Sequence, residues 1–225
     1  TLNTMSSVAK AVETLRLVTS KEPIKGLAQA FADAGFELAL VGGPVRDAFL
    51  GRPVHDLDFT TSATPEQSEK IVKPLAQATW DVGRAFGTIA AQVGPYTVEI
   101  TTYRADTYDG STRKPDVVFG TSLEEDLHRR DFTMNAMALT LPGAKLVDPC
   151  NGLDDLLAGV LRTPIEPEIS FQDDPLRMMR GARFVSQLGV AIHPDTAAAM
   201  TTLAPRIADI SAERVREELT RLLAT

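Results

Sequence analysis

The first half of the chain combines helical and strand-like hydrophobic patterns. Apolar residues recur at three- and four-residue steps over 6–34, which predicts a helical segment that ends at Gly35. Further helices are predicted at 44–51, 64–78 and 122–130, the last opening with the capping-box pair Ser122 and Glu125. Strands are predicted for short apolar or alternating runs at 36–43, 56–62, 88–94, 96–104 and 145–149.

The pattern changes near residue 151, because the remaining apolar residues recur mainly at helical spacing. Strands before this point and helices after it predict an α+β domain followed by an all-α domain. We therefore expect an N-terminal helical segment at 1–34, an α+β domain at 35–160 and a helical domain at 161–225. The polar loop 105–121 is long enough to suggest a functional or mobile segment.

The composition is that of a globular protein, with 44% hydrophobic and 24% charged residues, which excludes disorder throughout. The net charge of −7 argues against a polybasic nucleic-acid binder. The single cysteine excludes an intrachain disulfide and is compatible with a reducing cytoplasm. No run of about 18 apolar residues is present, so we expect no membrane span.

Three acidic residues form a candidate metal site. Asp56 and Asp58 stand two residues apart on a predicted strand, so both side chains project from one face. Adjacent carboxylates repel one another unless a cation lies between them, and Mg²⁺ prefers carboxylate oxygen. Glu99 would join them if its strand pairs nearby, as two-metal phosphoryl transfer requires. The alternative is an exposed strand edge for the aspartates and a polar-face position for Glu99.

A strand-to-turn-to-helix element precedes these carboxylates. Gly42 and Gly43 would let the backbone approach a phosphate at a helix N-terminus, and Arg46 could add a charged contact. The segment carries no Walker-type lysine. A plain connection between strand and helix explains the two glycines equally well.

Two arginine-rich segments follow. Arg177, Arg180 and Arg183 recur every three residues on a predicted helix, and Asp174 precedes them. Such a helix can present donors and acceptors to a base edge, although a helix cap with a solvated basic face is the simpler explanation. The second segment holds Arg129, Arg130, Asp131 and Asn135, which could equally be a charge pattern at a helix end.

Taken in order, these segments strongly resemble the class II tRNA nucleotidyltransferases, the CCA-adding enzymes, together with the bacterial poly(A) polymerases. The resemblance runs from about 22 to 222 and rests on seven segments: VGGPVRDAFLGR, HDLDFTT, VEITTYR, SLEEDLHRRDFTMNAMA, VDPCNGLDDL, DDPLRMMRGARF and SAERVREEL. It implies a polymerase-β-like head with a small mixed sheet, followed by a helical neck. It also implies that the body and tail domains of the family are missing from this sequence.

The resemblance assigns roles to the candidate residues. Asp56 and Asp58 would bind Mg²⁺, with Glu99 as the third carboxylate, and the glycine turn with Arg46 would bind triphosphate. Asp174 and Arg177 would read the base of CTP or ATP, and the loop 105–121 would switch the enzyme from C to A addition. Further nucleotide contacts would come from Arg130, Asp131, Asn135, Arg180 and Arg183. Asp173 departs from the family, which usually has glutamate there.

The activity implied is the addition of C and A to the 3′ end of tRNA, with release of pyrophosphate, in the cytoplasm. Two alternatives stay open at this point. The protein could be a poly(A) polymerase or an enzyme that adds only A, or it could be a truncated fragment that binds nucleotide without turnover. The sequence does not indicate an oligomeric state.

Overall fold

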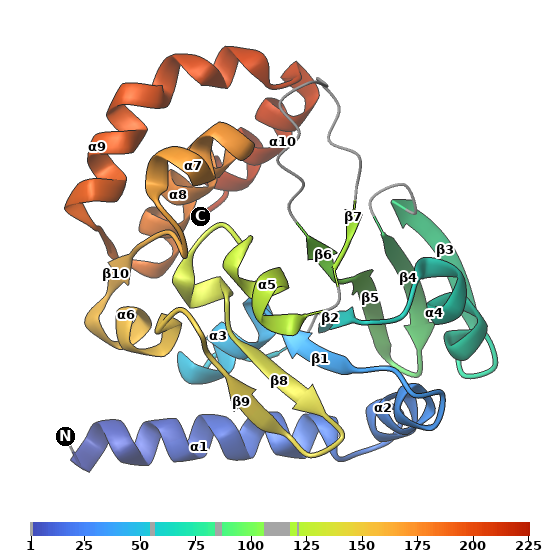
Figure 1. The fold of residues 1–225 in the computed structure, drawn as a ribbon. Coiled ribbons are helices and arrows are strands. Elements are labelled where there is room, and N and C mark those ends of the chain that lie inside the picture. Colours follow the sequence, from blue (N-terminus) through green and yellow to red (C-terminus); the bar gives the residue numbers. More distant parts are fainter. Residues whose placement is uncertain (1, 55–56, 84–86, 106–117, 121) are drawn as a thin grey trace. The chain divides into compact units, whose positions relative to one another are not determined.

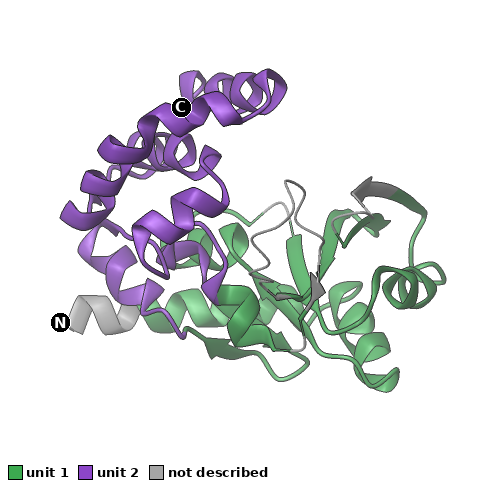
Figure 2. Ribbon diagram, turned by 45° about the horizontal axis from the view of Figure 1, so that its top comes forward, with its two compact units in different colours: residues 1–127, 137–148 green, residues 128–136, 149–225 purple. Residues whose placement is uncertain are grey.

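The computed structural model describes residues 2–54, 57–83, 87–105, 118–120 and 122–225. The chain divides into two compact units (Figure 2). Unit 1 comprises 1–127 and 137–148, and unit 2 comprises 128–136 and 149–225. The chain therefore enters unit 2 for nine residues, returns to unit 1 for a strand, and then completes unit 2. The domain boundaries expected from the sequence, at 34/35 and 160/161, stay predictions.

Unit 1 is built around a mixed seven-stranded sheet in the order β3-β4-β5-β2-β1-β8-β9 (Figure 1). The central strands β2 and β5 are parallel, whereas the other neighbouring strands are antiparallel. The strands span β1 Leu38–Val41, β2 Leu57–Thr61, β3 Ala78–Gly83, β4 Thr88–Val93, β5 Tyr96–Thr102, β8 Ala138–Leu141 and β9 Lys145–Val147. A separate two-stranded ribbon joins β6 Arg104–Ala105 to β7 Val118–Phe119. The strands predicted at 88–94 and 96–104 pair antiparallel as β4 and β5, and the strand predicted at 145–149 is β9 at the edge of the sheet.

The helices of unit 1 are α1 Leu2–Thr19, α2 Ile24–Asp33, α3 Gly43–Phe49, α4 Pro65–Val72 and α5 Leu123–His128. The prediction of one helical segment over 6–34 missed an interruption at 20–23, where Pro23 precedes α2. Proline lacks the N–H of a helix interior and disfavours helical backbone in the residue before it. The helix predicted over 64–78 is shorter for the same reason, because Pro74 follows the end of α4, and the strand β3 after it was not predicted.

Alternation along β5 separates a covered face of the sheet from an open one. Val98 and Ile100 are buried, whereas Thr97 and Glu99, which alternate with them, are exposed. Helices α2 and α4 pack against this sheet and against each other, and Leu27 and Phe31 of α2 are fully buried. The outward side chains of β5 therefore lie on the opposite face of the sheet.

Unit 2 is helical apart from a parallel ribbon of β10 Val160–Leu161 and β11 Ala191–Ile192. Its helices are α6 Gly152–Ala158, α7 Pro167–Asp173, α8 Leu176–Leu188, α9 Pro194–Leu203 and α10 Ala212–Leu223, with short 3-10 turns at Thr133–Asn135 and Ala204–Asp209. Phe132 and Phe184 pack edge to face, with ring centroids 5.9 Å apart. The two units together confirm the predicted α+β class. No helix in the described part of the chain is long and apolar enough to cross a membrane.

Candidate functional site

Two carboxylates face each other across the central parallel strands of unit 1. The register of β2 and β5 pairs Asp58 with Glu99. Neighbouring strands lie about 4.8 Å apart, so side chains at paired positions on one face are direct neighbours. Leu57 and Phe59, which flank Asp58, are buried with Val98 and Ile100, so the two carboxylates share the open face. The pairing of Glu99 with the strand of Asp58 was a condition in the sequence argument, and the structure meets it.

This pair suits a hard cation. Two carboxylates at adjacent positions repel each other, and a bound Mg²⁺ removes the repulsion by accepting their oxygens as ligands. Asp56, the predicted second aspartate, lies outside the described residues, as does His55. Among the residues that are described, no group of three or more His, Cys, Asp or Glu side chains forms a metal cluster. The described donors, Asp58 and Glu99, therefore fit part of the expected metal site.

The two-glycine turn lies at the same end of the sheet. Extending the antiparallel register of β1 and β2 by one residue brings Val41 opposite Asp58, and the turn follows at once. Gly42 has φ 71° and ψ −124°, a conformation that only glycine adopts without strain. Arg46, on the first turns of α3, is 6% exposed and pairs with Asp47 at 2.8 Å. Its guanidinium is thus held near the turn by its neighbour.

In unit 2, a buried aspartate organises the second group of candidates. Asp131 accepts hydrogen bonds from Nε and Nη2 of Arg180, at 2.9 and 2.7 Å, and from the Asn135 amide at 3.0 Å. Burial raises the pKa of Asp131, but the charge of Arg180 and the hydrogen bonds it receives outweigh that effect, so its pKa lies below the usual value. The charge of Asp131 likewise raises the pKa of Arg180 above its usual value. This geometry joins the segment 128–136 to α8.

Arg177 is held by a different set of groups. Its Nη1 donates to the Ser170 hydroxyl at 2.8 Å and its Nη2 to the Arg129 carbonyl at 2.6 Å. Ser170 is fully buried on α7, so the guanidinium is fixed by a rigid acceptor. Ser170 could not be predicted from the sequence, because an isolated serine seven residues upstream of Arg177 carries no spacing signal.

Asp174 lies between α7 and α8 and uses both carboxylate oxygens. Oδ1 accepts from the backbone N–H of Leu176 at 3.2 Å, although the N-cap position of α8 is Pro175 and not Asp174, as the sequence had suggested. Oδ2 accepts from Nη2 of Arg214, at 2.9 Å. Arg214 belongs to the SAERVREEL segment that carried the resemblance, but it had no role in the sequence argument.

The side chain of Arg183 is more buried than that of Arg180. Its Nε donates to Glu218 on α10 at 2.5 Å, and the two side chains are 11% and 4% exposed. The guanidinium also lies 4.3 Å from the ring centroid of Phe184. These contacts favour a role in joining α8 to α10, and direct nucleotide contact by Arg183 stays a prediction.

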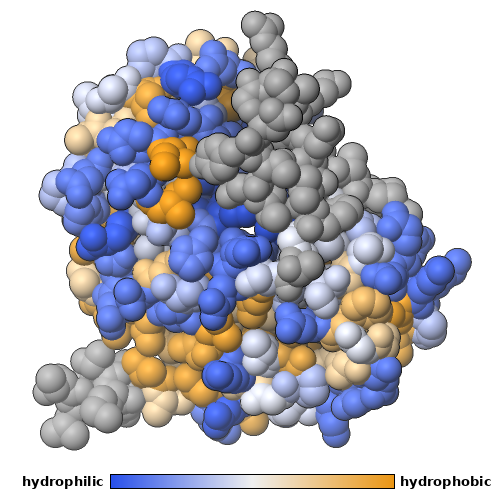
Figure 3. Space-filling model, in the orientation of Figure 1, coloured by the Kyte–Doolittle hydropathy of each residue, from blue (hydrophilic) through white to orange (hydrophobic). Residues whose placement is uncertain are grey.

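The remaining candidates are placed only in part. Arg130 belongs to the segment 128–136 and directly precedes Asp131. Of the loop 105–121, residues 106–117 and 121 lie outside the described residues, and its described ends form the ribbon of β6 and β7. On the face shown in Figure 3, hydrophilic residues predominate over the helices of unit 2.

Two family models match the chain. The Poly A polymerase head domain matches residues 38–162, and a model described as the "Probable RNA and SrmB- binding site of polymerase A" matches 189–225. The CCA-adding enzyme of Leuconostoc mesenteroides subsp. mesenteroides is 46% identical over 192 residues, which are 85% of this chain and 47% of that protein. The chain thus spans about half the length of the curated relatives it matches.

Solved structures agree with the sequence relatives. The Bacillus stearothermophilus CCA-adding enzyme in complex with CTP has a TM-score of 0.79 and 42% identity, covering 90% of this chain and 49% of that one. A tRNA nucleotidyltransferase complexed with a primer tRNA and an incoming ATP analog has a TM-score of 0.72 and 29% identity, covering 88% and 57%. With a head-domain match over more than half of its length, the chain belongs to the poly(A) polymerase and CCA-adding nucleotidyltransferase family.

Proposed function

We propose that this chain is the head and neck of an Mg²⁺-dependent tRNA nucleotidyltransferase that adds C and A to the 3′ end of tRNA. CTP and ATP are its nucleotide substrates, and pyrophosphate is released. The observation that carries the proposal is the pairing of Asp58 with Glu99 on the open face of the sheet, beside the two-glycine turn. The names of the relatives, and the CTP, ATP analog and primer tRNA in their structures, support these substrates.

Asp56 and Asp58 would hold the metal, with Glu99 beside them, because carboxylate oxygens are the ligands that Mg²⁺ prefers. When bound, Mg²⁺ neutralises phosphate charge and favours the deprotonated form of the attacking hydroxyl. The backbone at Gly42 and Gly43 would hold the triphosphate, since this turn approaches a ligand without side-chain hindrance. Arg46 would add positive charge there and orient the α-phosphate for in-line attack by the RNA 3′-hydroxyl.

Base selection would rest on Asp174 and Arg177. Cytosine N4 and adenine N6 carry amino groups that donate hydrogen bonds, whereas uracil and guanine carry oxygen at the matching positions. A carboxylate acceptor therefore pairs with C and A and is left facing an acceptor with U and G, which disfavours both. Arg177 would donate to acceptors on the base edge. Arg130, Asp131, Asn135, Arg180 and Arg183 are proposed as further nucleotide contacts or their supports.

A second candidate function is polyadenylation, favoured by the family model that names a poly(A) polymerase head. A third is nucleotide binding without turnover, because the chain spans only about half of its relatives. Such a fragment would discriminate nucleotides but transfer none. Cytoplasmic location stays a prediction that follows from the proposed substrates.

The first experiment measures incorporation of labelled CTP and ATP into a tRNA that lacks its 3′ CCA, with Mg²⁺, for the wild type and Asp58→Asn. We expect the variant to lose about 100- to 1000-fold in rate, the scale seen when a charge-stabilising group is removed from a transition state. Asp209→Asn, which removes an exposed carboxylate paired with Arg206 on unit 2, is the control and should retain the wild-type rate.

Product length separates the candidates. Addition that stops after CCA supports the proposed function, whereas long A tails support polyadenylation. Selective binding of CTP and ATP without any transfer supports the fragment. Full activity of Asp58→Asn in a folded protein would contradict the metal assignment.

A further inference from the structure

We propose that Arg214 is a positioning residue for base selection, which acts by holding the carboxylate of Asp174 in a fixed orientation. This inference rests on the proposed function, since it assigns the orientation of a group that the proposal uses. Nη2 of Arg214 lies 2.9 Å from Oδ2 of Asp174, although 40 residues separate them in the chain. Both residues belong to unit 2.

The carboxylate of Asp174 is anchored at both oxygens. The backbone N–H of Leu176 donates to Oδ1 at 3.2 Å, and Arg214 donates to Oδ2. Each carboxylate oxygen can accept two hydrogen bonds, so an amino group of a base can still be accommodated. Without Arg214, the contact with Leu176 would leave the plane of the carboxylate free to rotate. Two anchors define the direction in which Asp174 can accept from a ligand.

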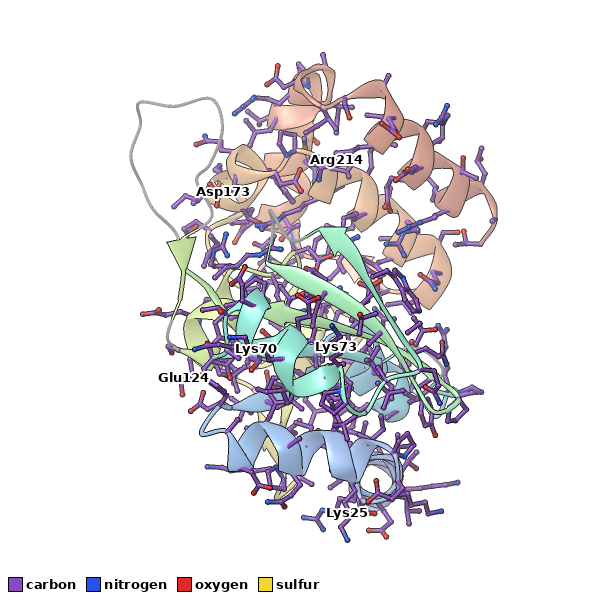
Figure 4. The ribbon with its side chains drawn as sticks, turned by 90° about the vertical axis from the view of Figure 1, so that its right-hand side faces the viewer. Lys25, Lys70, Lys73, Glu124, Asp173 and Arg214 are labelled. Carbon is purple, nitrogen blue, oxygen red and sulfur yellow. The ribbon has the colours of Figure 1, made fainter. Side chains whose placement is uncertain are left out.

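Arg214 can serve as an anchor because its own helix is well supported. The N–H of Arg214 donates to the Ser211 hydroxyl at the start of α10, at 3.4 Å. Farther along α10, the buried carboxylate of Glu218 pairs with Arg183 on α8. Figure 4 shows Arg214 and Asp173, the neighbour of Asp174, on the same helical unit. Helix α10 is therefore tied directly to α8, the helix that Asp174 precedes.

Stability alone does not account for this pair. The side chains of Arg214 and Asp174 are 49% and 29% exposed, and ion pairs with this much solvent contact contribute little to folding. The same pair does change the charge that a ligand meets at Asp174. A nucleotide triphosphate is strongly anionic, and a neighbouring guanidinium lowers the repulsion between it and the carboxylate. Arg214 thus both orients the acceptor and offsets its charge.

The test is equilibrium binding of CTP, ATP, UTP and GTP, each with Mg²⁺, to the wild-type chain, Arg214→Gln and Arg214→Lys. We expect Arg214→Gln to lower the preference for CTP and ATP over UTP and GTP by about tenfold, the effect of losing one charge-assisted hydrogen bond. Arg214→Lys should restore part of the preference, because lysine keeps the charge but not the fixed fork.

Arg206→Gln is the matched control, since Arg206 also pairs with an aspartate, Asp209, at 2.7 Å. Its side chain is 42% exposed, similar to the 49% of Arg214. It should keep the wild-type preference, and all variants should unfold thermally within a few degrees of the wild type. A ratio of affinities is the decisive readout, because a purely structural role would weaken all four nucleotides alike.

Each outcome decides the inference. A wild type that discriminates, with an Arg214→Gln variant that discriminates equally well, overturns the role of Arg214 and leaves the proposed function intact. Uniform loss of binding with a large drop in melting temperature also overturns it, in favour of a structural role. A wild type that binds all four nucleotides alike overturns base selection by this chain and the inference with it.

Discussion

Several candidate residues are fixed in place by ion pairs and hydrogen bonds with their neighbours. Asp131 is the clearest case, because its buried carboxylate is stabilised as an anion by Arg180, by Asn135 and by the backbone N–H of Phe132. A charge buried in this way is costly to strip of its partners, since it then lacks both water and a counter-ion. The residue is therefore a structural anchor for the segment that also carries Arg130, whatever it contributes to nucleotide binding.

The carboxylate of Asp131 makes the stability of the protein depend on pH. The pKa of Asp131 is lowered by folding, so its stabilisation is present above the unfolded pKa, near 3.9, and is lost as the pH falls through the folded value. Asp131→Asn should cost about 3 kcal/mol of unfolding free energy at pH 7, the lower end for a broken buried pair, since Arg180 is 33% exposed. The difference from wild type should shrink as the pH falls below 4.

Urea unfolding at pH 7, 5, 4 and 3 measures this difference. Asp195→Asn serves as the control, because this carboxylate is 83% exposed and should change stability by less than about 1 kcal/mol. A difference between Asp131→Asn and wild type that stays constant with pH would show that the carboxylate charge is not what stabilises unit 2.

At the scale of elements, α8 combines close packing with a row of arginines. Gly181 stands in its middle, where a Cβ atom would lie 3.1 Å from Cζ of Phe132 and 3.5 Å from Cε of Met200. Phe132 is fully buried and packs edge to face against Phe184. The absence of a side chain at Gly181 lets α8 pack closely against the segment 128–136. Close packing therefore explains why glycine stands at this position.

We therefore expect Gly181→Ala to destabilise the protein by about 1–2 kcal/mol, because overpacking outweighs the better helix propensity of alanine. Gly26→Ala is the matched control in α2, where the added Cβ meets only the end of the Glu22 side chain, at 2.8 Å. That exposed carboxylate accepts a hydrogen bond from the Gly26 N–H at 3.1 Å, which water can replace if the side chain moves, so Gly26→Ala should change stability by less than Gly181→Ala. Thermal and urea unfolding of both variants measure the contrast; equal effects would show that Phe132 yields.

At the scale of the whole molecule, the chain passes from one unit to the other more than once. The strand β8 belongs to unit 1, whereas the nine residues just before it belong to unit 2. The N–H of Thr133 donates to the Arg162 carbonyl at 2.8 Å, and Ala138–Leu141 pairs with β1. Residues 128–136 and the strand β8 that follows them are therefore protected from amide hydrogen exchange by two different cores.

Hydrogen exchange followed by mass spectrometry tests this division. Gly181→Ala should speed amide exchange in peptides that cover 128–136 and α8, because cooperative units of structure open together. Peptides that cover β8 and β9 should exchange as in the wild type. Faster exchange across 137–148 to the same extent would show that the two units open as one.

Several features follow from local sequence and could be predicted without a structure. They are the order of the motifs, the alternation of apolar and polar residues along strands, and the residues that start helices. Periodicity reports spacing of a few residues, and turn and capping residues act on their immediate neighbours. On this basis the sequence predicted the α+β class, the strand that carries Asp58 and the helix that carries Arg177, Arg180 and Arg183. It missed β3 and the break before α2, where tertiary pairing and a single proline override a helical pattern.

The partners of the candidate residues depended on the tertiary structure. The register of β2 and β5 brings Glu99 opposite Asp58, and helix packing gives Arg183 a buried partner in Glu218 and gives Asp174 an exposed one in Arg214. The three arginines that look equivalent as a stripe thus pair with different groups. Contacts between residues 35 to 49 positions apart arise from sheet register and helix packing, which local spacing does not encode.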